Sequence, residues 1–204
     1  MTPRRSPRKK PAQERSKETV RALLQAAARI LEQEGYERTS VNRIADVAGV
    51  SIGSLYQYFP TKEALVAAVA HKLSDDMLAV FQEGIQDDDF LPFRDAVRAI
   101  VARTVRAFRV NPRLRQVIVE ELPESVIGST EFDAWFADAL GAYFEHHRDH
   151  VFTARAESGP RDAKLAIALL MAAVEAAAKV ASLRGDPEDA VVDELTHMVL
   201  GYVL

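Results

Sequence analysis

The residues best suited to bind a metal ion are two histidines in the run EHHRDH at residues 145–150. His146 and His150 are four residues apart, so on a helix they share one face, a spacing found among zinc ligands. The chain has no cysteine, and its sequence offers no clear third ligand. A polar helix end is the simpler interpretation, so we predict no metal and no other cofactor. No cluster typical of an enzyme active site is evident either.

A second set of residues has the chemistry of DNA recognition. Ser54, Gln57 and Tyr58 lie on the outward side of a short predicted helix over residues 51–59. Such a helix is roughly 13 Å long, and the major groove is wide enough to admit it. The amide of Gln57 can donate to and accept from adenine at the same time.

Residues 40–59 are predicted to form two short helices joined by a tight turn, which would position these side chains. Ser40 is expected to cap the first helix through its hydroxyl, and Gly49 to end it in a left-handed conformation. Ser51 is expected to cap the second helix, and Pro60 ends it. Apolar residues recur at helical spacing on the inward side, namely Val41, Ile44, Ala45, Ala48, Leu55 and Phe59.

Longer helices are predicted on both sides of this pair. Residues 16–34 carry one apolar stripe and are followed by Gly35, which ends the helix, and by Tyr36, which packs back on it. Thr61 is expected to cap a fourth helix that runs to Phe81. That helix is a rod of roughly 30 Å.

The segment TSVNRIADVAGVSIGSLYQYFPTKEAL, residues 39–65, resembles the DNA-binding segment of the tetracycline-repressor (TetR) family of transcriptional regulators. The similarity extends back to about residue 16, and beyond residue 65 the chain matches only in being helical. The resemblance implies that these residues contact DNA: Thr39, Ser40, Asn42, Arg43, Ser51, Ile52, Gly53, Ser54, Tyr56, Gln57, Tyr58 and Lys62. Core packing remains an alternative for Tyr56 and Tyr58, and a solvated helix face for Arg43.

Two positions depart from the family pattern. Ile52 stands where the family often has a basic residue, which removes a phosphate contact but allows packing on a thymine methyl. Arg43 stands where an acidic residue often completes a capping box. The cap of that helix is therefore expected to be weaker.

The charge of the chain is unevenly distributed. Net charge is −4, but residues 1–72 contain 13 Lys or Arg and 7 Asp or Glu residues, a formal charge of +6. Residues 73–204 contain 13 basic and 23 acidic residues, a formal charge of −10. Residues 1–15 form a basic, proline-containing arm that we expect to be disordered, either a solvated tail or an additional DNA contact. Only the first part of the chain suits a phosphate backbone.

Helical patterns continue through residues 93–204, and no stretch alternates like a strand. We predict a mostly apolar ligand pocket among these helices, with Glu121 and Glu175 as polar groups. Ordinary core packing is the alternative for the apolar candidates, and an internal arginine such as Arg103 or Arg106 is the other expected partner of the glutamates. The pocket candidates are Phe81, Phe108, Glu121, Trp135, Phe136, Phe144, Met171 and Glu175.

The last two helices carry more apolar surface than one partner helix can cover, which predicts a homodimer, with ordinary core packing as the alternative. The predicted fold is all-α, with an arm over residues 1–15, a helix-turn-helix DNA-binding domain over 16–61 and a ligand-binding and dimerisation bundle over 62–204. The predicted function is a cytoplasmic repressor, without a membrane segment, that a small apolar ligand releases from a palindromic operator. The alternative is a helical interaction module or ligand-binding protein without specific DNA recognition.

Overall fold

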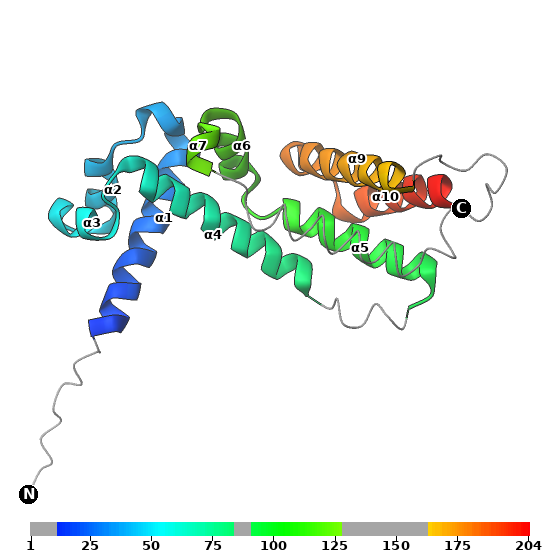
Figure 1. Ribbon diagram of the computed structural model, residues 1–204, viewed down its shortest axis with the longest axis horizontal. Coiled ribbons are helices and arrows are strands. Elements are labelled where there is room, and N and C mark those ends of the chain that lie inside the picture. The colour runs from blue at the N-terminus through cyan, green and yellow to red at the C-terminus, as the bar shows by residue number, and fades with distance from the viewer. Residues whose placement is uncertain (1–11, 84–90, 128–162) are drawn as a thin grey trace, which may run out of the picture. The chain divides into compact units, whose positions relative to one another are not determined.

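A computed structural model describes residues 12–83, 91–127 and 163–204, and every regular element in these ranges is a helix (Figure 1). The prediction of an all-α fold is confirmed. None of the described helices is long and apolar enough to cross a membrane. Several predicted features lie outside the described residues, namely most of the basic arm, Trp135, Phe136, Phe144 and the pair His146 and His150.

The chain divides into two compact units. Unit 1 comprises residues 1–69 and 117–126, and unit 2 comprises residues 70–116 and 127–204. Three helices, α4, α6 and α7, have residues in both units. The helices of unit 1 are α1 (Ala12–Arg38), α2 (Val41–Ala48), α3 (Ile52–Tyr58), the start of α4 (Lys62–Gln82), the end of α6 (Pro112–Glu121) and most of α7 (Glu124–Ile127).

Unit 1 is organised around an apolar core to which α1, α2, α3 and α4 all contribute. Leu23, Leu31, Ile44, Leu55 and Leu65 have no exposed surface. These residues lie on the inward faces that the helical spacing predicted. Helix α1 begins at Ala12, about one turn before the helix start predicted at residue 16.

The turns between the helices follow local rules. Gly49 ends α2 with φ 66° and ψ 32°, as predicted, and the Val50 N–H donates to the Ala45 carbonyl at 2.9 Å. The Ser51 hydroxyl caps α3 by accepting from the Ser54 N–H at 3.1 Å. The Thr61 hydroxyl caps α4 by accepting from the Ala64 N–H at 3.1 Å.

The predicted side-chain cap at Ser40 is not formed. Ser40 is the extended residue before α2, and its carbonyl accepts from the Ile44 N–H at 3.0 Å, but its hydroxyl makes no capping bond. Arg43, in place of the acid of a capping box, binds Glu34 instead. The start of α2 is therefore held by packing and backbone bonds.

Helix α1 breaks at Gly35, which has φ 79° and ψ 174°. Only glycine adopts this backbone conformation cheaply. Beyond the break, Tyr36 is buried, as predicted, and the last residues of α1 form a single further turn. The break directs the chain into the start of α2.

In unit 2, α5 (Phe93–Phe108) packs against α9 (Ala163–Arg184) and α10 (Glu188–Val203). Buried side chains of α5 include Val97, Val101, Val105 and Phe108. Each of the other two helices buries one narrow stripe: Ala166, Leu170, Val174, Ala178 and Ala181 on α9, and Val192, Leu195, Thr196, Val199 and Val203 on α10. The Ser182 hydroxyl, which donates to the Phe108 carbonyl at 2.9 Å, joins α9 to the end of α5.

Gly35→Ala is predicted to destabilise the protein by roughly 1–3 kcal/mol. The φ of 79° strains an alanine, and its Cβ would stand 2.5 Å from Glu121 Oε2. Chemical denaturation gives the free energy of unfolding. Gly201→Ala is the matched control, because a Cβ at that helical glycine meets nothing within 4 Å. Equal stability of both variants would contradict the role assigned to the break.

Candidate DNA-binding site

Helix α3 is held in place by two buried apolar side chains. Leu55 in its middle and Phe59 just after its end face the core of unit 1. Because these two residues fix the rotation of so short a helix, the remaining positions face outward. Ile52, Gly53, Tyr56 and Gln57 are all exposed.

The exposures settle one alternative left open by the sequence. Tyr56 is 47% exposed, so it is not a core residue. Ile52 is 38% exposed and offers its apolar side chain to solvent. Ser54 and Tyr58 are half-buried. The outward side of α3 thus presents an aliphatic side chain, an aromatic ring and an amide.

Two hydroxyls are already engaged at the start of α3. The Oγ atoms of Ser51 and Ser54 lie 2.9 Å apart, in addition to the capping bond between these residues. Both hydroxyls therefore help to form the helix end. Each retains acceptor capacity for an external donor.

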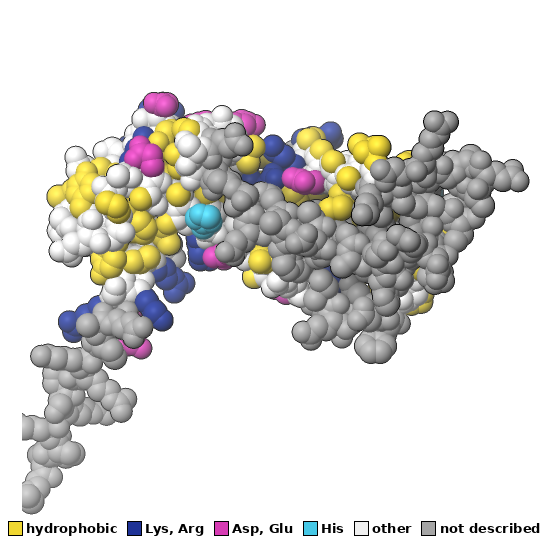
Figure 2. All heavy atoms as spheres, viewed as in Figure 1, with side chains coloured by type: hydrophobic (Ala, Val, Ile, Leu, Met, Phe, Trp, Pro, Cys, Tyr) yellow, Lys and Arg dark blue, Asp and Glu magenta, His cyan; other side chains and the backbone are white. Residues whose placement is uncertain are grey.

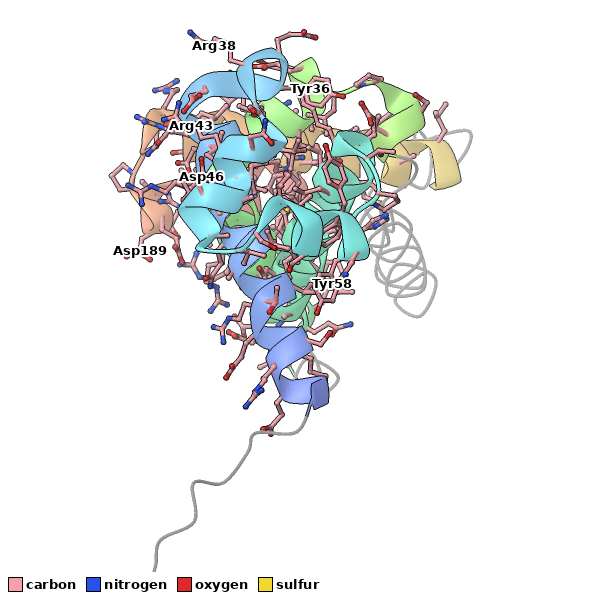
Figure 3. The ribbon with its side chains drawn as sticks, turned by 90° about the vertical axis from the view of Figure 1, so that its left-hand side faces the viewer. Tyr36, Arg38, Arg43, Asp46, Tyr58 and Asp189 are labelled. Atoms are coloured by element: carbon pink, nitrogen blue, oxygen red, sulfur yellow. The ribbon has the colours of Figure 1, made fainter. Side chains whose placement is uncertain are left out.

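Helix α2 presents Asn42 and Arg43 to solvent. Arg43 Nη1 lies 2.8 Å from Glu34 Oε1, so its charge is balanced within unit 1. In Figure 3, Arg43 and Asp46 lie on one side of unit 1 and Tyr58 on the other. The exposed groups thus extend across α2 and α3.

The structure corrects the role predicted for Thr39. This residue is buried, and its hydroxyl donates to the Gly35 carbonyl at 2.7 Å. The carbonyl is free because the helix breaks at Gly35. Thr39 therefore supports the turn before α2, and its side chain is not available to a phosphate. Ser40 beside it is exposed.

Lys62 also has an internal partner. Its Nζ donates to the Tyr36 carbonyl at 2.6 Å and stands 4.1 Å from the centre of the Tyr36 ring. A cation at the end of a helix stabilises the exposed carbonyls there, and the ring adds a cation–π attraction. The predicted phosphate contact by Lys62 would compete with these bonds.

Tyr36 is the centre of a small polar network. Its hydroxyl lies 3.4 Å from Glu63 Oε1. Burial raises the pKa of Tyr36, and the negative charge of Glu63 raises it further. The pKa of Glu63 is lowered, first by its own backbone N–H and then by the Thr61 hydroxyl. The tyrosine therefore stays neutral and the glutamate ionised at neutral pH, as a donor–acceptor pair requires.

Glu121 belongs to this network and not with the other pocket candidates. Its Oε2 accepts from the Tyr36 backbone N–H at 2.7 Å, within unit 1. The N–H needs a partner because the helix break takes away its usual acceptor. The assignment of Glu121 to the ligand pocket is thereby corrected. The sequence signal for this role is Gly35 itself: a helix break there leaves backbone groups that need polar partners.

The described pocket candidates in unit 2 lie close to charged groups. Phe81 and Phe108 are buried, and Met171 is half-buried. Arg115 stands 4.2 Å from the centre of the Phe108 ring, and its Nη2 lies 3.5 Å from Glu175 Oε1. Glu175 thus has an arginine partner, Arg115, which the sequence did not single out. Among the described residues, no group of His, Asp and Glu side chains could hold a metal ion.

The geometry of α2, the turn at Gly49 and α3 is that of a helix-turn-helix protein. Two family models match this chain, one at each end of the chain. Residues 23–69 match the family described as bacterial regulatory proteins, tetR family, and residues 92–202 match the tetracyclin repressor-like C-terminal domain. The chain belongs to the TetR family.

Curated relatives match just under half of the chain. The regulator UidR of Escherichia coli K12 is 31% identical over 98 residues, 48% of this chain and 49% of UidR. The transcriptional repressor KstR2 of Rhodococcus jostii is 33% identical over 85 residues, 42% of this chain and 41% of KstR2. The chain therefore aligns with about half the length of these curated relatives.

Solved structures share the fold over nearly the whole chain. FadR of Bacillus subtilis, in complex with stearoyl-CoA, has a TM-score of 0.64 at 14% identity and covers 90% of this chain and 99% of its own. LfrR of Mycobacterium smegmatis, in complex with proflavine, has a TM-score of 0.56 at 22% identity and covers 92% and 98%. At these identities the likeness concerns the fold alone.

Gly53→Ala is predicted to separate folding from DNA binding. A Cβ at Gly53 meets nothing within 4 Å, and alanine is the better helix former, so stability should rise by about 0.5–1 kcal/mol. DNA affinity should fall, because the exposed glycine lets the backbone of α3 approach the sugar-phosphate chain closely. Thermal unfolding and fluorescence anisotropy measure the two effects. Unchanged affinity would show that α3 does not approach DNA at this residue.

Proposed function

We propose that this protein is a DNA-binding transcriptional repressor that leaves its operator when a small, mostly apolar effector binds. Unit 1 is assigned to DNA binding, and unit 2 to the effector and to dimerisation. The relatives support the proposal: KstR2 is a transcriptional repressor by name, and UidR a transcriptional regulator.

The observation that carries the proposal is the outward face of α3. Leu55 and Phe59 anchor this helix, so Ile52, Tyr56 and Gln57 are offered together to solvent. Exposed apolar and aromatic groups on a short helix have no role in the core of unit 1. They match base edges in a major groove, where Gln57 would bind adenine and Ile52 a thymine methyl.

A second copy of the chain would supply the other half of the operator. Helix α9 carries an apolar stripe on the side opposite its buried one, with Leu165, Leu169, Val180 and Leu183 exposed. Small exposed residues between them, Ala172, Ala173 and Ala176, permit close helix packing. On α10, Met198 is 40% exposed. A two-fold interface built from α9 and α10 would present two reading helices to half-sites roughly 34–36 Å apart.

The effector is assigned to unit 2. The structures of LfrR with proflavine and of FadR with stearoyl-CoA belong to proteins of this fold, and they support a ligand-binding role for the corresponding helices here. Phe81 and Phe108 supply apolar surface, and Arg115 and Glu175 supply polar groups. Helix α4 contributes residues to both units, so a change in its packing would reach α3. Effector and DNA would then oppose each other with a coupling of about 1–3 kcal/mol.

Selection from a pool of random DNA duplexes, at about physiological salt, tests the proposal. We expect enrichment of a palindromic site. Gln57→Ala should relax the preference at one base pair of each half-site and cost about 1–3 kcal/mol there. Gln33→Ala removes an exposed amide from α1 and should change nothing. A folded protein that enriches no sequence would contradict specific DNA recognition. The selected duplex then serves to screen effectors by release.

Leu169→Glu is predicted to convert a dimer into monomers. Leu169 is 59% exposed, so the charge costs little in the folded chain but is buried without a partner in the proposed interface. Sedimentation equilibrium measures the mass of the assembly. Val119→Glu is the matched control, since Val119 is 51% exposed on α6. If Leu169→Glu sediments as the wild type does, α9 is not the interface.

A further inference from the structure

The positive charge of the chain does not reside in its helix-turn-helix segment. Residues 23–69, which match the family's DNA-binding domain, hold four basic and five acidic residues, a formal charge of −1. Residues 1–22 hold eight basic and two acidic residues, a formal charge of +6. Helix α3 itself carries no charged side chain. Over α2 and α3 the surface in Figure 2 is accordingly yellow and white, while dark blue side chains gather along α1.

Three of the four basic residues in residues 23–69 already have internal partners. Arg43 pairs with the Glu34 carboxylate at 2.8 Å. Arg38 Nε donates to the Glu34 carbonyl at 2.9 Å, and Lys62 Nζ donates to the Tyr36 carbonyl at 2.6 Å. To bind a phosphate, each would have to give up or share these bonds. The domain that reads DNA is thus poorly equipped to supply the electrostatic part of the affinity, which counterion release normally provides.

The basic residues in the first turns of α1 are, by contrast, exposed and without internal ion pairs in the described part of the chain. Helix α1 begins at Ala12, but its first buried residue is Leu23. Arg15, Lys17 and Arg21 lie before that point and are exposed. Within the described part of the chain, none of the three forms an ion pair. Between residues 14 and 22 no side chain is fully buried, although Thr19, Val20 and Ala22 are half-buried. So short a helical stretch gains little stability of its own in water, and its helical form is suited to a partner that packs along it.

We propose that residues 1–22, with Arg15, Lys17 and Arg21 on the helical part, bind the phosphate backbone of DNA and supply most of the sequence-independent affinity. This inference rests on the proposed DNA-binding function and divides it between two segments. Residues 12–22 rise roughly 15 Å along a helix axis, which is the axial span of about four phosphates on one strand. Specificity remains with α3, because phosphate contacts position a protein and carry no base information.

The test compares two full-length triple variants of equal net charge. One is Arg15→Ala, Lys17→Ala and Arg21→Ala. The other removes three exposed arginines from unit 2: Arg94→Ala, Arg106→Ala and Arg113→Ala. Affinity for a selected operator duplex and for a scrambled duplex is measured across a range of salt concentrations, and circular dichroism checks that both variants are folded.

We expect the α1 variant to lose affinity by the same factor for both duplexes, and its slope of log K against log salt to be shallower by about 2–3, or roughly 0.9 for each lost phosphate contact. The unit 2 variant should match the wild type in slope and in affinity. Replacing Arg4, Arg5, Arg8, Lys9 and Lys10 by serine in the α1 variant should flatten the slope further.

An unchanged slope in the α1 variant would overturn the inference. A loss confined to the operator duplex would also overturn it, since these residues would then read sequence. The scrambled duplex separates this outcome from failure of the proposed function. If the wild type enriches no operator, the slope on the scrambled duplex still reports whether residues 1–22 bind phosphates.

Discussion

The break in α1 at Gly35 is the constraint on which the DNA-binding unit depends. The positive φ at this residue interrupts the helical hydrogen bonding, so that the Gly35 carbonyl accepts from the Thr39 hydroxyl and the Tyr36 N–H donates to Glu121. The Tyr36 carbonyl accepts from the Thr39 backbone N–H at 3.2 Å and from Lys62 Nζ at 2.6 Å. These side chains come from the α1–α2 turn, α6 and α4. One backbone irregularity therefore ties the start of α2 and α4 and the end of α6 to α1.

The same break explains which polar residues remain available outside. Thr39 and Lys62 bind the backbone carbonyls at the Gly35 break, and Arg43 pairs with Glu34. These three polar side chains near α2 therefore have partners inside unit 1. The exposed side chains of α3 are free of this structural role. Its exposed residues, Ile52, Tyr56 and Gln57, are uncharged, which suits discrimination between base edges better than attraction to phosphates. Ile52, the departure from the family pattern, belongs with this division of roles.

Local rules predicted the local structure well. Gly49, Ser51 and Thr61 act where short-range capping rules placed them, since each rule involves a backbone group within a few residues. The Ser40 hydroxyl cap is not formed, and Arg43, which stands at the position of the capping-box acid, has no acceptor with which to bind the Ser40 N–H and pairs with Glu34.

Long-range partners were the limit of the sequence reasoning. Glu121 was assigned to a ligand pocket, yet its acceptor role lies at Tyr36, 85 residues earlier. Composition and helical spacing contain no information on such a pairing. Glu175 was expected to bind an arginine, and Arg115 on α6 pairs with it, a residue that helical spacing alone did not single out. Tyr56 was ambiguous for the same reason until Leu55 and Phe59 fixed the rotation of α3.

The length of α3 is the reason why specific recognition by this fold calls for a second copy of the chain. A helix of seven residues is about 10 Å long, so it can reach only a few base pairs. Each mismatched base pair typically costs about 1–3 kcal/mol, and one such helix cannot discriminate an operator among the many competing sites of a genome. Doubling the number of base pairs read requires a second copy held at a fixed separation. Among the described residues, the exposed side of α9, with Leu165, Leu169 and Val180 beside small alanines, has the apolar surface that the proposed dimer would use to fix it.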